Sequence, residues 1–217
     1  METKIVLTGI ARSKGKAAGE AMVFSHRFGW AFNHVGNEGT ESFWPYQRDE
    51  NLARPWAVPG TPDLMHRIGG IEKEAGTGNI SYDPANHEYM VRMRAARIAK
   101  IADDIAPALV DGDDDAELLV VGWGSTWGAI ATASERVRRA GHKVARVHLT
   151  HLNPFPKNLG EVLARYPKVI VPEMNLGQLS RLLRAEYLVD AKSISKIMGQ
   201  PFTAAELQQR ILEALGD

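Results

Sequence analysis

The C-terminal half of the chain alternates short apolar runs with longer stretches of helical periodicity, and this alternation constrains the fold more than any other feature. Apolar runs of about four to six residues are typical of buried strands in parallel sheets. The predicted strands are residues 118–121, 144–149, 168–173 and 187–194. The predicted helices are residues 129–140, 159–166, 176–185 and a last helix that follows Thr203. This order predicts an α/β fold, a doubly wound parallel sheet with helices on both faces.

The ends of two predicted helices carry recognisable capping residues. Gly141 follows the first helix, where a C-terminal glycine belongs. Thr203 and Glu206 have the spacing of a capping box at the start of the last helix. Phe202 precedes this cap and is expected to pack against Leu207. The first helix is expected to face the core with Ile130, Ala133 and Val137.

Three regions are predicted along the chain. Residues 1–40 are glycine-rich, with short β-like runs and too few residues for an independent core. Residues 41–110 combine an extended segment, rich in proline and aromatic residues, with a helix. Residues 111–217 hold the α/β domain. The acidic run 111–117 is predicted to be a solvated linker at the boundary between the last two regions.

The extended segment is predicted to wrap around another surface rather than form a helix or a central strand. Proline fixes φ and removes a hydrogen-bond donor, which disfavours both elements. Its bulky aromatic side chains are expected to pack against a domain or a partner chain. These side chains are Phe43, Trp44, Tyr46 and Trp56.

A helix is predicted to begin at Asp83 and Pro84, an acidic N-cap followed by proline at the first helical position. Its expected apolar stripe consists of Met90, Val91, Arg94, Ile98 and Ile101. His87 lies in the first turn, where a positive charge is unfavourable, and is expected to be neutral and structural. The charged residues 72–74 before this helix are expected to be solvated in a loop.

Composition excludes several classes of function. The 217 residues carry 26 basic and 26 acidic side chains, so the chain has no net charge to attract nucleic acid or an anionic membrane surface. No apolar run approaches the length of about 20 residues that spans a bilayer, and no signal peptide is evident. The chain has no cysteine, which excludes disulfides and cysteine-ligated clusters on it. A cytoplasmic protein is expected.

The turn after the first strand raises the question of a nucleotide site. Its glycines, Gly122, Gly124 and Gly128, have the spacing G-x-G-x-x-x-G, and no acidic residue ends the second strand. Both features depart from the dinucleotide-binding pattern, so we interpret the turn as structural. Gly124 is expected to permit a tight bend without room for a side chain, and Ser125 or Thr126 is expected to cap the helix. An anion at this helix N-terminus stays an alternative.

A second candidate edge follows the third predicted strand. Glu173 ends this strand, and Asn175 to Gln178 open the next helix, so a carboxylate and an amide could face a ligand or another subunit. An ordinary capped helix with Asn175 as N-cap is the alternative. His148 and His151 lack a neighbouring acid and predict no metal site. The candidate ligand or subunit edge is therefore Gly124, Ser125, Thr126, Glu173, Asn175 and Gln178, with no residue assigned to catalysis, to a cofactor or to a metal.

From about residue 41 onward the sequence resembles the C-terminal part of the α subunit of 2-oxoacid:ferredoxin oxidoreductases, and its 2-oxoglutarate branch most of all. Long stretches in the same order carry the resemblance and cover about four-fifths of the chain. They are "FWPYQRDENLARPWAVPGTPD", "HRIGGIEKEAGTGNISYDPANHEYMVRMRAARI", "LLVVGWGSTWGAI", "HLNPFPKNLGEVLARYPKVIVPEMNLGQLSRLLR" and "YLVDAKSISKIMGQPF".

The resemblance implies oxidative decarboxylation of 2-oxoglutarate with coenzyme A to succinyl-CoA and CO2, with reduction of ferredoxin. It implies thiamine diphosphate and Mg2+ in the assembled complex rather than on this chain alone, and an iron–sulfur cluster on the partner only. The β subunit is the implied partner, and activity is expected only with it. Residues 111–217 would be a transketolase C-terminal-like domain, and residues 41–110 the tail of the thiamine pyrimidine domain with its connector.

Residues 1–40 do not match this family, and two alternatives therefore stay open. One is a non-catalytic α/β interaction module or truncated fragment, because the pyrimidine domain expected upstream is not visible. The other is a swivelling subunit of the aconitase-X type of dehydratase, which the stretch "GKAAGEA" faintly resembles. Neither alternative predicts binding to nucleic acid or a membrane.

Overall fold

The structure is a computed structural model that describes residues 43–216. The chain divides into two compact units, of which the first ends at Asp104 and the second begins at Ile105. We describe each unit by itself. The expectations for residues 1–40, including the dehydratase alternative, lie outside the described residues. Among the described residues, no helix is both long and apolar enough to cross a membrane.

The first unit contains one long helix, α2 (Pro84–Lys100), which a short 3-10 turn, η2 (Ile101–Asp103), continues. The predicted helix start is confirmed, because Asp83 is the N-cap and its side chain accepts a hydrogen bond from the Ala85 N–H at 3.0 Å. The predicted apolar stripe is wrong as a core face. Only Met90 of this helix is buried, whereas Val91 and Ile98 are more than 40% exposed.

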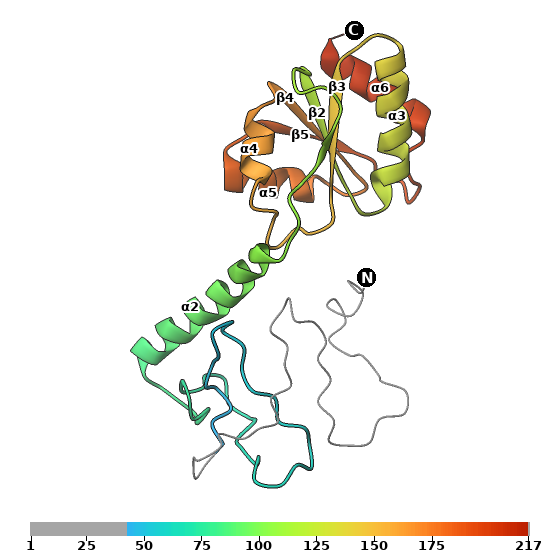
Figure 1. Cartoon of the computed structure of the whole chain (residues 1–217). Helices are drawn as coiled ribbons and strands as arrows, with labels where there is room; N and C mark the ends of the chain where they lie inside the picture. The colour runs from blue at the N-terminus through green and yellow to red at the C-terminus, as the bar shows by residue number, and fades with distance from the viewer. Residues whose placement is uncertain (1–42, 217) are drawn as a thin grey trace. The chain divides into compact units, whose positions relative to one another are not determined.

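Residues 43–83 run without a regular helix or strand, as the extended trace in Figure 1 shows. Two isolated bridges, Tyr46 with Gly76 and Lys73 with Ile80, give this segment its local order. Its bulky aromatic side chains are only partly covered, and Trp44 and Trp56 are more than 40% exposed. The expectation that they pack on a further surface stays a prediction.

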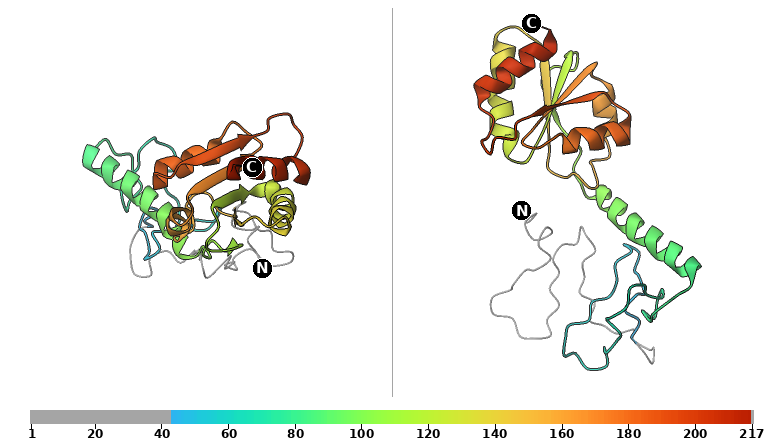
Figure 2. Two further views of the ribbon diagram at one scale, coloured as in Figure 1. Left: turned by 90° about the horizontal axis from the view of Figure 1, so that it is seen from above. Right: turned by 180° about the vertical axis from the view of Figure 1, so that it is seen from behind.

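The second unit is a five-stranded sheet with helices on both faces, which confirms the predicted fold class (Figures 1 and 2). The strand order is β1-β3-β2-β4-β5. The strands are β1 (Val110–Asp111), β2 (Leu118–Trp123), β3 (Val144–Leu149), β4 (Lys168–Glu173) and β5 (Ala191–Ser195). The helices are α3 (Trp127–Arg139), α4 (Leu159–Ala164), α5 (Gln178–Tyr187) and α6 (Ala204–Leu215), with a 3-10 turn η3 (Gly124–Thr126) before α3.

The edge strand β1 corrects the interpretation of the acidic run as a solvated linker. Val110 pairs with Val147 and Asp111 with Arg146, so β1 extends the sheet in the antiparallel direction. Asp111 also accepts a hydrogen bond from Arg138 at 3.0 Å. Hydrogen bonding to Arg138 is the main cause of the lowered pKa of Asp111, and nearby Arg146 adds to it. The run therefore starts inside the α/β unit.

Two apolar layers hold the helices on the sheet. Helices α3 and α6 cover one face, and α4 and α5 cover the other, as the view from behind shows (Figure 2). The predicted inward residues of α3, Ile130, Ala133 and Val137, are all at most 1% exposed. Phe202 packs on the same layer as Leu207, as expected for the start of α6. Continuous burial of β2 and β4 on both faces explains their unbroken apolar sequences.

The cap of α6 is confirmed in detail. The Thr203 hydroxyl accepts a hydrogen bond from the Glu206 N–H at 3.2 Å, and the Glu206 carboxylate accepts one from the Thr203 N–H at 2.7 Å. Hydrogen bonds from Lys196 and then from Thr203 lower the pKa of Glu206 to about 2. Helix α5, by contrast, begins and ends two residues later than predicted. Gly177 and Leu188, both with left-handed backbone angles, set these limits.

Candidate functional site at the carboxyl edge of the sheet

The carboxyl edge is the set of loops that follow strands β2, β3, β4 and β5. The chain leaves β2 toward β3 on one side, and returns across the sheet to β4 on the other. Pairing between β2 and β4 stops at Val120 and Ile170, although each strand continues for three more residues. The strands therefore part at a topological switch point, the place where open α/β sheets bind ligands.

The glycine turn after β2 is held in shape by the backbone of Gly124 and by hydrogen bonds of the Thr126 side chain. Gly124 has φ +57°, which favours glycine, and this supports the interpretation of a bend. The Thr126 hydroxyl donates to the Trp123 carbonyl at 2.8 Å and accepts from the Trp123 N–H at 3.3 Å. The Thr126 side chain closes the 3-10 turn and makes no capping hydrogen bond to α3. The expectation that Ser125 or Thr126 caps this helix is therefore not met by Thr126. The crowding expected at Gly124 is absent, because a Cβ there would meet no atom within 4 Å.

Gly122, for which no crowding was predicted, is the glycine in a crowded position. A Cβ on Gly122 would lie 2.6 Å from Ile130 Cδ1 and 2.9 Å from His148 Nδ1. Both distances are too short for real side-chain contacts, so a side chain at position 122 would require Ile130 and His148 to shift. Its buried position in an apolar strand followed by a helix is the sequence signal that could have indicated this role.

An aromatic and basic cluster lies beside this turn. The rings of Trp127 and His148 meet edge to face with centroids 5.1 Å apart. The Arg146 guanidinium lies 5.1 Å from the Trp127 ring centre. Burial lowers the pKa of His148, an effect that a hydrogen bond with the Gly124 backbone partly opposes. At neutral pH the cluster therefore holds an uncharged His148 against a half-exposed Trp127.

Glu173 lies at the end of β4 and is fully buried. One carboxylate oxygen accepts a hydrogen bond from the Ser180 N–H at 3.0 Å, while Oε2 has no hydrogen-bond partner. Burial is the main cause of its raised pKa, and backbone N–H groups of the first turn of α5 act in the opposite direction. The carboxylate is directed to the start of α5 and not to solvent.

The loop after Glu173 is closed by Asn175. Its side-chain oxygen accepts hydrogen bonds from the Gly177 N–H at 2.8 Å and the Gln178 N–H at 2.9 Å. The side chain thus satisfies the first donor of α5, although Gly177 occupies the N-cap position itself. Gln178 is exposed at the first residue of the helix.

The six candidate edge residues therefore share one edge of the sheet but differ in exposure. Gly124, Ser125 and Gln178 are exposed, and Asn175 is half-buried. Thr126 and Glu173 are buried and act inside their own turns. The exposed members could face a ligand or a subunit, and their role stays a prediction.

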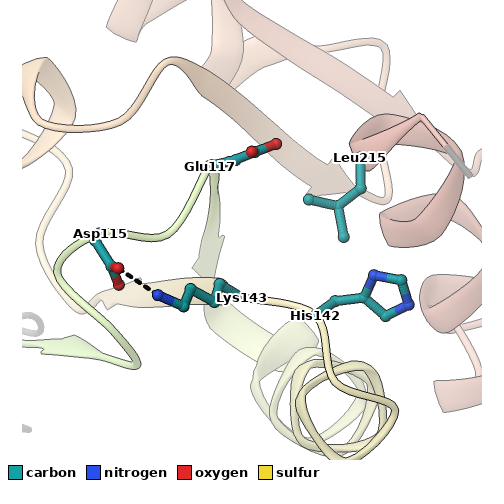
Figure 3. A pocket seen from close by; sticks show the side chains of 5 residues that line it. All are labelled: Asp115, Glu117, His142, Lys143 and Leu215. Carbon is teal, nitrogen blue, oxygen red and sulfur yellow. Dashed lines mark hydrogen bonds and ion pairs between the residues drawn. The ribbon is translucent and has the colours of Figure 1, made fainter.

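A hollow of about 440 Å3 lies at the opposite, amino end of the strands (Figure 3). It is lined by Asp115, Glu117, His142, Lys143 and Leu215, and Lys143 forms an ion pair with Asp115. Asp115 and Glu117 belong to the acidic run that was predicted to be a solvated linker, and none of the five residues was a predicted site residue. We keep the carboxyl edge as the candidate site, because parallel sheets bind ligands there and because the hollow is lined mainly by exposed charges.

In the first unit, the expectation of solvated charges at residues 72–74 is wrong for Lys73 and in part for Glu72, whereas Glu74 is exposed as expected. Lys73 is only 5% exposed, and its ammonium group donates to the Arg67 carbonyl at 2.7 Å. The Glu72 carboxylate contacts Nδ1 of the His87 ring. The position of His87 in the first turn of the helix did not predict this acidic partner. The hydrogen bond from His87 is the main cause of the lowered pKa of Glu72. These contacts fasten the loop to the start of α2.

Comparison with known proteins identifies the class of the α/β unit. Residues 116–207 match the family of pyruvate:ferredoxin oxidoreductase core domain II. A solved structure, 2-oxoglutarate:ferredoxin oxidoreductase from Magnetococcus marinus with 2-oxoglutarate, coenzyme A and succinyl-CoA bound, has a TM-score of 0.75 and 33% identity. It covers 83% of this chain, which spans 32% of that chain.

Two curated relatives show which subunit of these oxidoreductases the chain resembles. The 2-oxoglutarate oxidoreductase subunit KorA of Mycobacterium tuberculosis is 55% identical over 186 residues, covering 84% of this chain. Subunit alpha of 2-oxoacid:ferredoxin oxidoreductase 1 from Aeropyrum pernix is 36% identical over 184 residues, covering 80% of this chain. In both cases this chain spans 28% of the relative's length. The resemblance to the C-terminal part of the α subunit of 2-oxoglutarate:ferredoxin oxidoreductase is confirmed.

Proposed function

We propose that this chain acts as part of the α subunit of a thiamine-diphosphate-dependent 2-oxoacid:ferredoxin oxidoreductase. The assembled enzyme would decarboxylate 2-oxoglutarate oxidatively with coenzyme A, giving succinyl-CoA, CO2 and reduced ferredoxin. The observation that supports this proposal most is the 55% identity to a 2-oxoglutarate oxidoreductase subunit over 84% of the chain. The Magnetococcus marinus structure, which has 2-oxoglutarate, coenzyme A and succinyl-CoA bound, is consistent with 2-oxoglutarate and coenzyme A as the substrates.

Thiamine diphosphate and Mg2+ would supply the decarboxylation chemistry in the assembled complex. No group of three or more His, Cys, Asp or Glu side chains converges among residues 43–216, and no residue of this chain is proposed to hold Mg2+ or the diphosphate. The 217 residues contain no cysteine, so a cysteine-bound iron–sulfur cluster of the complex would be held outside them. We propose a β subunit as the partner that brings these groups. We also propose the cytoplasm as the location.

Within such a complex, the role proposed for this chain is to present the carboxyl edge. Thr126, Glu173 and Asn175 fix the two turns through internal hydrogen bonds. Rigid turns keep exposed groups in a defined geometry at little entropic cost when a ligand or subunit binds. We propose that Gly124, Ser125 and Gln178 are the members of this edge that face the ligand or subunit.

Reconstitution tests the proposal. The chain would be co-expressed with the β subunit and any further α-subunit segment encoded beside it, and ferredoxin reduction would be followed with 2-oxoglutarate, coenzyme A and thiamine diphosphate. We expect reduction that depends on both substrates, and no reduction by the 217-residue chain alone. Turnover by the chain alone would refute the requirement for a β subunit.

A non-catalytic interaction module is the second candidate. The observation that favours it is that Trp127, a large aromatic side chain at the carboxyl edge, is half exposed, as is typical of an interaction surface. The same reconstitution separates the two functions. If the chain binds the β subunit but every combination lacks 2-oxoglutarate-dependent ferredoxin reduction, while the M. tuberculosis relative assayed in parallel is active, the interaction module is supported.

A further inference from the structure

Two guanidinium groups meet the same carboxylate between helix α3 and the edge of the sheet. Asp111 of β1 pairs with Arg146 of β3, and its carboxylate lies 2.5 Å from Arg146 Nη2. Arg138 of α3 donates to this carboxylate from its own Nη2 at 3.0 Å. His148 adds no charge at neutral pH, because burial lowers its pKa. Two positive charges therefore share one negative charge, which leaves an excess of positive charge at this place.

Arg146 is the member of this group whose hydrogen-bonding capacity is largely unused. Its side chain is only 16% exposed, and its Nε and Nη1 atoms are buried without a hydrogen-bond partner among the described residues. Nε carries one N–H and Nη1 carries two, whereas the ion pair with Asp111 uses Nη2. Charged donors that stay unsatisfied away from solvent are costly. An acceptor at this position would remove that cost.

The excess charge favours an anion as this acceptor. A water molecule accepts hydrogen bonds but does not balance a charge, whereas a carboxylate or phosphate oxygen does both. Hydrogen bonds from a guanidinium to such oxyanions are about twice as strong as neutral ones. The free donors of Arg146 are buried, so a single oxyanion group of a small molecule suits them. Nucleic acids and membrane surfaces are instead recognised by several exposed basic side chains.

Trp127 places Arg146 beside the carboxyl edge. The Arg146 guanidinium lies 5.1 Å from the Trp127 ring centre, and Trp127 directly follows the turn η3 at this edge. The His148 ring meets the same indole edge to face, with the ring centroids 5.1 Å apart. Half of Trp127 is nevertheless exposed. An exposed aromatic ring beside a charged donor suits a ligand that carries an oxyanion on an organic body.

We propose that Arg146 and Trp127 form an oxyanion subsite at the carboxyl edge, which takes the carboxylate or phosphate group of a small molecule. The subsite gives a chemical class to the ligand proposed for this edge, and the source of the oxyanion rests on the proposed function. In that function 2-oxoglutarate would supply carboxylates and coenzyme A would supply phosphates. The subsite itself rests on the contacts of Arg146, and inorganic phosphate tests it without reference to the reaction.

A titration of the purified 217-residue chain with inorganic phosphate, 2-oxoglutarate and coenzyme A tests the proposal. The indole N–H resonance of Trp127, assigned from its loss in Trp127→Phe, should shift and saturate in the NMR spectrum. Added sodium chloride should weaken this binding, because salt screens charge. Tighter binding of coenzyme A than of phosphate would identify a phosphate source, and tighter binding of 2-oxoglutarate than of phosphate would identify a carboxylate source.

Substitutions at the two ends of the ion pair should act in opposite directions. Arg146→Gln should raise the dissociation constant at least about tenfold, because it removes a charged donor group. Arg146→Lys keeps the charge but loses the planar guanidinium, and should raise the dissociation constant less. Asp111→Asn removes the carboxylate that competes for Arg146, and should lower the dissociation constant about threefold.

The matched control is Arg139→Gln, which makes the same chemical change on α3 at a 75% exposed arginine paired with Glu135. It should bind the probes as the unmodified chain does, and thermal melting should show that all variants fold. A Trp127 resonance that shifts with none of the three probes would overturn the proposal. So would an equal loss of binding in Arg139→Gln, or weaker binding by folded Asp111→Asn. Intact phosphate binding with an inactive reconstituted enzyme would refute the proposed function but not the subsite.

Discussion

The two ends of the parallel strands differ in chemistry although the same strands produce both. The carboxyl edge carries glycine turns, neutral polar residues and exposed apolar side chains, with its one buried carboxylate, Glu173, directed inward. The amino edge carries exposed acidic and basic residues that pair with each other, such as Asp115 with Lys143. The carboxyl edge therefore exposes more apolar surface than the amino edge, and its contact with other molecules stays a prediction.

The largest effect that would sharpen this comparison is expected at Gly122. Gly122→Val forces side-chain atoms into Ile130 and His148 beneath the carboxyl edge and should lower the free energy of unfolding by about 3 kcal/mol. Urea unfolding measures this change. Gly128→Ala is the control, because a Cβ there meets no atom within 4 Å and it should stabilise α3 by about 0.5 kcal/mol. Equal stability of the two variants would show that the close approach at Gly122 is not needed.

Glu173 provides the next effect. Glu173→Ala leaves first-turn N–H groups of α5 without an acceptor and should cost about 2 kcal/mol. Because burial raises the pKa of Glu173 in the folded state, that state holds the proton more tightly than the unfolded chain. Its contribution to stability is therefore present at low pH and is lost as pH rises from the unfolded value through the folded value.

Glu173→Gln, which keeps an acceptor oxygen and removes the titration, should flatten this part of the pH profile of stability. Chemical denaturation at a series of pH values from the acidic to the neutral range measures it. The matched control at the amino edge is Glu117→Gln, which makes the same chemical change at an exposed carboxylate. A Glu173→Gln profile with the same slope as the unmodified chain would contradict the role given to burial.

Gly124 should show a smaller effect with a different cause. Gly124→Ala places a Cβ in open space but requires a left-handed backbone, at a cost of about 1 kcal/mol. Gly124→Asn should cost less, because asparagine tolerates this conformation better. Thermal or urea unfolding compares the two. An asparagine variant that is less stable than the alanine variant would indicate crowding in place of backbone strain.

The smallest effect is expected at His148. Burial lowers its pKa in the folded state, so the unfolded chain binds the proton more readily. Stability should therefore fall as pH decreases below the unfolded histidine value of about 6.5. His148→Gln should remove this part of the acid sensitivity, and unfolding curves at neutral and mildly acidic pH measure the difference. An unchanged pH dependence would show that His148 does not titrate in this range.

Much of the α/β unit could be predicted from the sequence because local rules decided it. The apolar runs predicted the limits of β3 and β4, and the Thr203–Glu206 spacing predicted the cap of α6. Each of these signals involves residues that are close together in the sequence. The prediction was wrong where long-range contacts decided. β1 depends on pairing with β3, and Lys73 is buried by its bridge to Ile80 and its bond to Arg67.

At the carboxyl edge, too, some features could be predicted from the sequence and others could not. The sequence alone determined the order of strands and helices, the turns that follow the strands and the resemblance to an enzyme subunit, because periodicity, capping and motif order are properties of neighbouring residues. Only the tertiary structure decided that Glu173 is buried while Leu176 is exposed, and which atoms of Ile130 and His148 lie against Gly122. Burial and adjacency depend on which strands pair, and no local pattern specifies that pairing.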